Sequence, residues 1–237
     1  MRDTIESEKM RVAYEAVTYV EDGMILGVGS GSTMKYFIDY LKELVEEGLQ
    51  IHVVPTSIET RDACIANEIP LYEGEYVPVS IDLCVDGADE FDDNLNLIKG
   101  GGGHLLWEKI VASTAKRIII ITDSRKHVKK LGETFKLPLE VIPYAIESVK
   151  NKLSNLGFSA TLRMKDDIAY RTEEGNYILD CNTGPISDAY ALGTVLSNIT
   201  GVVEHGLFLD LCNTVLQGCG QDILVFDKTD HVEERTS

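Results

Sequence analysis

Carboxylates, a lysine and a run of glycines occur close together between positions 86 and 108. Asp86 and Asp89 follow an apolar run, Lys99 leads directly into four glycines (100–103), and Glu108 comes soon afterwards. Glycine loses more backbone entropy on ordering than any other residue, so four in succession favour a loop that approaches another molecule closely. Acids, a cation and bare backbone amides together indicate a site for an anionic, hydroxylated small molecule.

This segment has the groups that proton transfer requires. Glu108 falls near the start of a predicted helix, where burial would raise its pKa and make it a candidate general base. Asp86 and Asp89 follow a predicted parallel strand, at the edge where open α/β sheets bind ligands. They could bind sugar hydroxyls or relay protons. The simpler alternatives are an exposed glutamate, a solvated lysine and an acidic turn. A binding site is favoured over these alternatives because the glycines and the acids occur together in one short segment.

A second segment, residues 27–33 (Gly-Val-Gly-Ser-Gly-Ser-Thr), lies between a predicted strand and a predicted helix. Alternate glycines allow a tight turn with exposed amides, and two hydroxyls and the helix N-terminus would attract an anion. The segment lacks the P-loop pattern. It also departs from the strict dinucleotide fingerprint, because Ser32 occupies the third glycine position. Phosphate binding is favoured over a plain turn with a Ser/Thr N-cap.

The remaining chemistry-bearing residues are scattered. His104 could face the site or be structural, and Trp107 is better explained as a packing residue. The other histidines form no pattern typical of a metal site, so no metal is expected. Five cysteines without a C-x-x-C pair favour reduced thiols, several of them in the core.

The composition is that of a globular protein and argues against several partners. The 237 residues suffice for one large domain or two modest ones. A formal net charge of −17 argues against nucleic acid, so any phosphate must be captured by local amides and a few lysines. The apolar runs are too short to cross a bilayer, and the charged N-terminus has no signal-peptide core. We therefore expect a cytoplasmic protein without membrane or nucleic-acid partners.

Helix-like and strand-like segments alternate over the first two-thirds of the chain, which predicts a mostly parallel sheet with helices on both faces. Apolar periodicity predicts helices near residues 12–20, 37–48, 58–67 and 105–116. Apolar or β-branched runs predict strands at 24–28, 51–55, 81–85, 94–98 and 117–122.

The pattern then becomes α+β with antiparallel character. Extended segments are predicted at 137–143, 160–164, 168–172 and 177–181, with a hairpin turn at 174–176 and helices at 145–156 and 186–199. Closing strands are predicted at 202–207, 214–216 and 223–226. We expect a larger α/β domain, residues 1–131 plus 207–237, with a smaller inserted α+β domain, residues 132–206.

Together these motifs closely resemble ribose-5-phosphate isomerase of the A type, over nearly the whole chain. The resemblance rests on residues 29–33, 86–90, 99–103, 108–109, 123–126, 137–143, 176–180 and 201–208. The spacings from Asp86 to Asp89, Lys99, Glu108 and Lys126 match the family. This combination is far more specific than any one motif.

The resemblance implies an aldose–ketose isomerase without metal or redox cofactor that interconverts ribose 5-phosphate and ribulose 5-phosphate in the pentose phosphate pathway. It makes Glu108 the base that moves a proton between C2 and C1, and Lys99 the cation that stabilises the enediolate. Asp86 and Asp89 would assist ring opening and proton exchange at O1 and O2. The implied phosphate and sugar contacts are Ser30, Gly31, Ser32, Thr33, Gly100, Gly101, Gly102, Lys126 and Lys9.

The family fold is a Rossmann-like domain carrying a smaller α+β domain, in homodimers or homotetramers. Two positions depart from the family, since many members have a small residue in place of His104 and an arginine in place of Trp107.

Two other functions stay open at this point. A sugar-phosphate sensor of the same fold would bind without turnover, but the retained acids and lysine, and the absence of a basic helix-turn-helix segment, argue against it. A nicotinamide-dependent dehydrogenase conflicts with Ser32 and lacks a suitably placed acid after the first glycine turn. Turnover without a cofactor would separate the isomerase from both.

Overall fold

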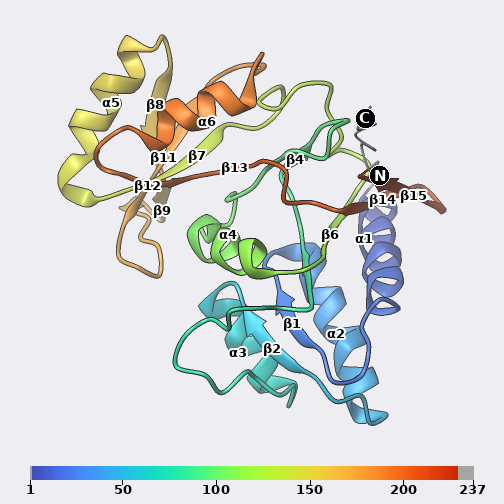
Figure 1. Ribbon diagram of the computed structural model, residues 1–237. Coiled ribbons are helices and arrows are strands. Elements are labelled where there is room, and N and C mark those ends of the chain that lie inside the picture. Colours follow the sequence, from blue (N-terminus) through green and yellow to red (C-terminus); the bar gives the residue numbers. More distant parts are fainter. Residues whose placement is uncertain (1, 229–237) are drawn as a thin grey trace, which may run out of the picture.

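A six-stranded, mostly parallel sheet forms the centre of the larger part of the molecule (Figure 1). The computed structural model describes residues 2–228, so positions 229–237 of the expected larger domain lie outside the described residues. The strands are β1 (Ile25–Val28), β2 (His52–Pro55), β3 (Leu83–Asp86), β6 (Ile118–Thr122), β14 (Thr214–Cys219) and β15 (Asp222–Asp227). Their order is β15-β14-β6-β3-β1-β2, and only β15 runs antiparallel to its neighbour. This confirms the predicted α/β class.

Helices cover both faces of this sheet. They are α1 (Arg2–Val17), α2 (Ser32–Glu46), α3 (Ile58–Ala66) and α4 (Leu105–Thr114). Side chains alternate across a strand, and β6 shows the consequence. Ile119 and Ile121 pack with the α1 and α2 side chains, whereas Ile118 and Ile120 pack with Val111 of α4.

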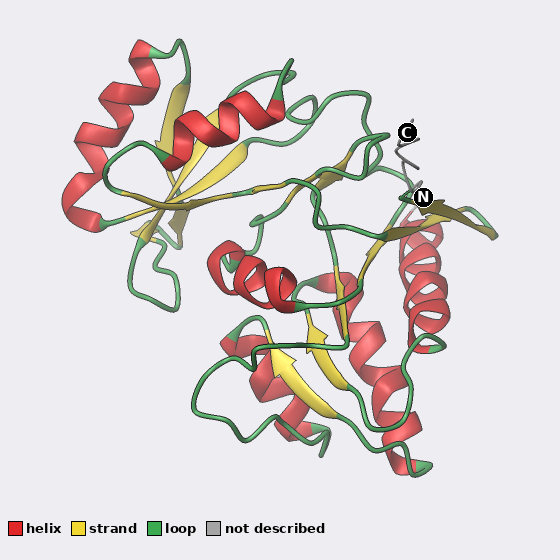
Figure 2. Cartoon of the chain, in the orientation of Figure 1, coloured by secondary structure: helices red, strands yellow, loops and turns green. Residues whose placement is uncertain are grey.

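A four-stranded antiparallel sheet forms the second, smaller part (Figure 2). Its order is β12-β7-β11-β8, and its strands are β7 (Leu137–Val141), β8 (Ser159–Leu162), β11 (Tyr177–Asn182) and β12 (Val202–His205). The helices α5 (Ile146–Asn155) and α6 (Ala189–Ser197) share a core with it. A 3-10 turn (Pro143–Ala145) precedes α5, and a short ribbon joins β9 (Met164–Lys165) to β10 (Ile168–Ala169). We propose the same division as before, with residues 132–206 as the smaller domain.

Two segments of this part differ in detail from the prediction. The chain reverses at 174–176 as expected, but the preceding segment meets β11 only through a bridge between Arg171 and Tyr177. The neighbours of β11 in the sheet are instead β7 and β8. Helix α6 begins later than expected, because the Asp188 carboxylate accepts the amide of Ala191 and so caps the helix there.

A small three-stranded sheet, β13-β5-β4, was not predicted as such. Its strands are β4 (Glu90–Phe91), β5 (Leu97–Ile98) and β13 (Leu207–Phe208). The predicted strand at 94–98 shrinks to its last two residues, because Asp92 Oδ1 accepts the amides of Asn94 and Asn96 and bends the chain into a turn. This sheet places Lys99, whose amide donates to the carbonyl of Gly206.

Among the described residues, no helix is both long enough and apolar enough to span a membrane.

Candidate active site

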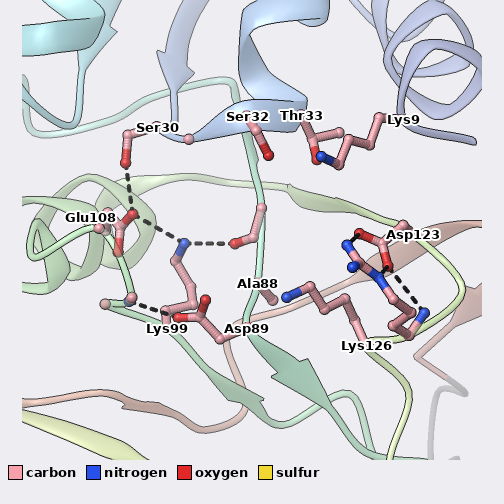
Figure 3. Close-up of a pocket in the computed structure, with 16 residues that line it drawn as sticks. Lys9, Ser30, Ser32, Thr33, Ala88, Asp89, Lys99, Glu108, Asp123 and Lys126 are labelled. Atoms are coloured by element: carbon pink, nitrogen blue, oxygen red, sulfur yellow. Dashed lines mark hydrogen bonds and ion pairs between the residues drawn. The ribbon is translucent and has the colours of Figure 1, made fainter. Parts of the chain in front are cut away.

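The segments singled out by sequence meet around one cavity of about 150 Å³ (Figure 3). It lies where β1 and β3 end and where the glycine loop, residues 100–103, leads into α4. Carboxyl ends of parallel strands share one edge of a sheet, which explains why segments distant in sequence converge there. Its lining consists of Lys9, Ser30, Gly31, Ser32, Thr33, Gly87, Ala88, Asp89, Lys99, Gly100, Gly101, Gly102, Glu108, Asp123, Arg125 and Lys126.

Lys99 lies buried between two carboxylates. Its Nζ is 3.0 Å from Asp86 Oδ2 and 3.4 Å from Glu108 Oε1, and it donates to the carbonyl of Gly87 at 2.6 Å. Burial acts to lower the pKa of Lys99, but Asp86 and Glu108 outweigh it and raise that pKa above its usual value. The ammonium therefore stays charged at neutral pH.

Glu108 is only 5 % exposed, in the first turn of α4. Its Oε1 accepts the hydroxyl of Ser30 at 3.0 Å and faces Lys99, whereas Oε2 is buried and has no hydrogen-bond partner among residues 2–228. Burial raises its pKa to about 7, although Lys99 acts in the opposite direction. A carboxyl group with such a pKa can take up and release a proton at neutral pH.

The two aspartates differ in their surroundings. Asp86 does not line the cavity: its Oδ1 accepts the amides of Ser30 and Gly87, and its Oδ2 pairs with Lys99. Asp89 does line the cavity, and its Oδ2 accepts the amide of Gly101 at 2.7 Å. Burial raises the pKa of Asp89 even though that amide works against the shift. Asp86 thus holds Lys99 in place, and Asp89 faces the space open to a ligand.

The other end of the cavity is suited to an anion. Gly31 precedes α2 with a φ of 99°, a conformation that favours glycine, and within the described part of the chain no side-chain cap hydrogen bond forms there. The α2 N-terminus, with Ser32 and Thr33, therefore faces the cavity with unsatisfied backbone donors. Lys9, which pairs with Glu6 at 2.7 Å, lies beside Thr33 (Figure 3).

Lys126 extends into the cavity next to Ala88 (Figure 3). Asp123 and Arg125 also line the cavity, although the sequence analysis did not select them as site residues. The Arg125 guanidinium contacts both oxygens of Asp123 at 2.8 Å. Burial would raise the pKa of Asp123, but Arg125 and its amide lower it below its usual value. The sequence did contain one sign that these two residues belong to the site, because both lie in the motif at 123–126 beside Lys126.

His104 and Trp107 do not line the cavity. His104 Nδ1 is 2.5 Å from Glu173 Oε1, and Trp107 Nε1 donates to Glu174 Oε1 at 2.9 Å. Both side chains therefore attach the start of α4 to the turn at residues 172–176 of the smaller part. The expectation that Trp107 is a packing residue misses this hydrogen bond.

Within residues 2–228, no three His, Cys, Asp or Glu side chains are grouped so that they could hold a metal ion. The cysteines are unpaired, and all except Cys219 are buried. Burial raises the pKa of the Cys64 thiol to about 12, as expected for a core residue.

Comparison with known proteins agrees with this geometry. Residues 52–222 match the family model described as ribose 5-phosphate isomerase A (phosphoriboisomerase A). The ribose-5-phosphate isomerase A of Ruegeria pomeroyi is 44 % identical over 228 residues, which cover 91 % of this chain and 85 % of that protein. That of Levilactobacillus brevis is 47 % identical over 213 residues, which cover 89 % of this chain and 92 % of that protein.

Solved structures give the same result over the whole fold. The ribose 5-phosphate isomerase A of Methanocaldococcus jannaschii superposes with a TM-score of 0.88 at 41 % identity, covering 94 % of this chain and 99 % of that one. A D-ribose-5-phosphate isomerase in complex with phospho-erythronic acid gives 0.90 at 38 % identity, with coverage of 94 % and 99 %. The chain belongs to the ribose 5-phosphate isomerase A family.

Proposed function

We propose that the protein interconverts ribose 5-phosphate and ribulose 5-phosphate through an enediolate, with Glu108 as the general base. One observation carries the proposal. Glu108 is a buried carboxyl with a pKa of about 7, fixed through one oxygen and beside the charged Lys99, in a cavity that ends at an uncapped helix N-terminus. A base and an oxyanion-stabilising cation at one end, and an anion site at the other, match a phosphorylated carbonyl compound.

The phosphate would bind to the backbone amides and hydroxyls of residues 31–33, with Lys9 and Lys126 supplying positive charge. Both lysines line this cavity, within a chain of strongly negative net charge. The glycine loop would contact the sugar through its bare backbone, since residues 100–102 also line the cavity. This arrangement would place the carbonyl end of the open-chain sugar near Glu108 and Lys99.

Isomerisation requires two proton movements. Glu108 would remove the proton from C2 and return it to C1, while the ammonium of Lys99 stabilises the negative charge on the enediolate oxygens. A proton must also leave O2 and arrive at O1, since the aldehyde oxygen becomes a hydroxyl as the C2 hydroxyl becomes a carbonyl. We assign this exchange, and assistance to ring opening, to Asp89, which lines the cavity. We assign Asp86 to orienting Lys99.

We further propose a cytoplasmic homodimer or homotetramer acting in the pentose phosphate pathway. The family resemblance supports all three statements. Exposed apolar side chains, among them Tyr144, Met164 and Ile168 on the smaller part, support self-association alone. Light scattering at micromolar concentration would measure the oligomeric state.

The proposed reaction is tested by incubating the protein with ribose 5-phosphate alone and detecting ribulose 5-phosphate directly. Turnover supports the isomerase. Thermal stabilisation by ribose 5-phosphate without any product would contradict the isomerase and favour the sensor of the same fold.

A further inference from the structure

One arginine of the smaller part binds the backbone of the glycine loop. Arg163 lies between β8 and β9, and its side chain is only 14 % exposed. Its Nη1 donates to the carbonyl of Gly100 at 2.7 Å and to that of Gly101 at 3.0 Å. These contacts span more than sixty positions in sequence, and Arg163 does not itself line the cavity.

The contact matters because of the peptide it holds. The carbonyl of Gly100 and the amide of Gly101 belong to the same peptide unit, and in a planar trans peptide these groups point in opposite directions. Arg163 binds the carbonyl on one side, and Asp89 Oδ2 accepts the amide on the other at 2.7 Å. The orientation of this one peptide plane therefore links Arg163 to Asp89.

Arg163 is itself held rigidly. Asp180, on β11, accepts hydrogen bonds from both Nε and Nη2 of Arg163, and the Nε contact measures 3.0 Å. A paired, fork-like contact of this kind fixes the plane of the guanidinium. Tyr170 adds a further contact, because its hydroxyl donates to the carbonyl of Gly102 at 3.2 Å. The smaller part thus supports the loop at three successive carbonyls.

The charge of Arg163 also acts on Asp89. Lys99, Lys126 and Arg163 are the cations whose charges lower the pKa of Asp89, against the effect of burial, and Glu108 is the neighbouring acid that interacts with it. Lys99 and Lys126 belong to the larger part and line the same cavity as Asp89. Arg163 is the member of this set that the smaller part supplies.

We propose that Arg163 is a positioning residue for the isomerisation: it orients the Gly100–Gly101 peptide so that its amide holds Asp89 in the geometry for proton exchange between O1 and O2. This inference rests on the proposed function, because it concerns a step of that reaction. The smaller part of the fold would then contribute to catalysis through Arg163, by way of the glycine loop and without contact with the substrate.

The direct test measures the link between Arg163 and Asp89 without turnover. In protein labelled with [15N]glycine, the Gly101 amide proton should shift with pH as Asp89 titrates, because an amide that donates to a carboxyl group reports its ionisation. In Arg163→Met the midpoint should move to higher pH and the size of the shift should fall. Arg171→Met is the matched control, since Arg171 contacts Gly175 and Tyr177 but not the loop. Equal titration curves for wild type and Arg163→Met would overturn the inference.

Kinetics with ribose 5-phosphate provide the second readout. Arg163→Met should lower kcat by about ten- to a hundredfold, as expected when a catalytic group is misplaced by a remote change. KM should stay within about threefold, because the phosphate site at α2 is untouched. Arg163→Lys should recover part of the loss, since it retains a cation. A tenfold rise in KM with kcat unchanged would contradict positioning.

A further variant guards against simple unfolding. Asp180→Asn retains the charge of Arg163 but loosens its guanidinium. It should therefore reduce the size of the Gly101 shift, as Arg163→Met does, without moving the midpoint to higher pH, because a negative charge beside Arg163 has been removed. If wild type itself fails to isomerise ribose 5-phosphate, the proposed function is wrong, whereas the amide titration still decides whether Arg163 positions Asp89.

Discussion

Replacement of Lys99 by methionine removes the charge at the centre of the site while retaining most of the side-chain volume. The ammonium is 3.4 Å from Glu108 Oε1 and 3.0 Å from Asp86 Oδ2. Lys99→Met therefore has two consequences: the enediolate loses its cation, and Glu108 loses the neighbour that opposes the rise in its pKa.

The size of both effects follows from the geometry. Loss of one preorganised oxyanion donor costs about 3–4 kcal/mol, or a factor of about a hundred to a thousand in kcat. Two unit charges 3.4 Å apart attract by about 5 kcal/mol at an effective dielectric constant of about 20. Since one pKa unit corresponds to about 1.4 kcal/mol, removal of Lys99 should raise the pKa of Glu108 well above its value of about 7. The base would then be mostly protonated at neutral pH.

The assay is the pH dependence of kcat/KM for ribose 5-phosphate between pH 5.5 and 9.5, with wild type and Lys99→Met side by side. The variant should lose at least about a hundredfold at pH 7 and recover part of that loss at high pH. Lys116→Met is a control for the loss of a lysine–aspartate pair, because Lys116 contacts Asp82 at the surface. A loss below about tenfold, with an unchanged acid limb, would refute both roles assigned to Lys99.

Three further predictions concern the base and the anion site. In wild type, kcat/KM should rise with pH to a plateau above about 7, because Glu108 must be ionised to act as base; a flat profile down to pH 5.5 would contradict this. The folded-state pKa of Glu108 lies above its usual value of 4.5, so its ionisation destabilises the fold as pH rises through that window. Glu108→Gln should therefore be more stable than wild type at pH 8, by at most about 3 kcal/mol, with a difference that disappears near pH 4.5. A pH-independent difference in thermal unfolding would rule this out. Lys126→Ala should raise KM about tenfold with little change in kcat, whereas Lys129→Ala, which does not line the cavity, should leave both unchanged.

The central sheet and most of the site were predictable from sequence because both follow from simple rules. Buried parallel strands appear as short apolar runs, and polar residues at their carboxyl ends gather at one edge. Asp86, Asp89 and residues 29–33 occupy that edge. Lys99 and Glu108 were found through the glycine loop, whose composition has few purely structural explanations.

The parts that were missed depend on contacts that carry no local pattern. The sheet around β4 and β5 forms because Asp92 bends the chain, and two-residue strands have no detectable periodicity. Likewise, nothing around Arg163 in the sequence shows that it reaches Gly100, since that contact exists only after the two parts of the fold have packed. Which aspartate faces the cavity also depended on packing, because Asp86 ends the same strand that Asp89 follows.

His104 and Trp107 were also hard to interpret from sequence, because their contacts form only when the two parts of the fold pack together. Each is typical of a core or surface residue when read alone. In the structure each binds one of two consecutive glutamates, Glu173 and Glu174, and so attaches the helix of Glu108 to the smaller part.

The central claim is that Glu108 moves the proton between C2 and C1. The most direct test follows deuterium in ribose 5-phosphate labelled at C2, with wild type and Glu108→Gln, in the presence of EDTA and without added cofactor. Wild type should release deuterium from C2, to C1 of the product or to solvent, at a rate matching the formation of ribulose 5-phosphate. Glu108→Gln should release none while still being stabilised by ribose 5-phosphate in a thermal shift assay. Deuterium release by Glu108→Gln at a rate near that of wild type would contradict the account.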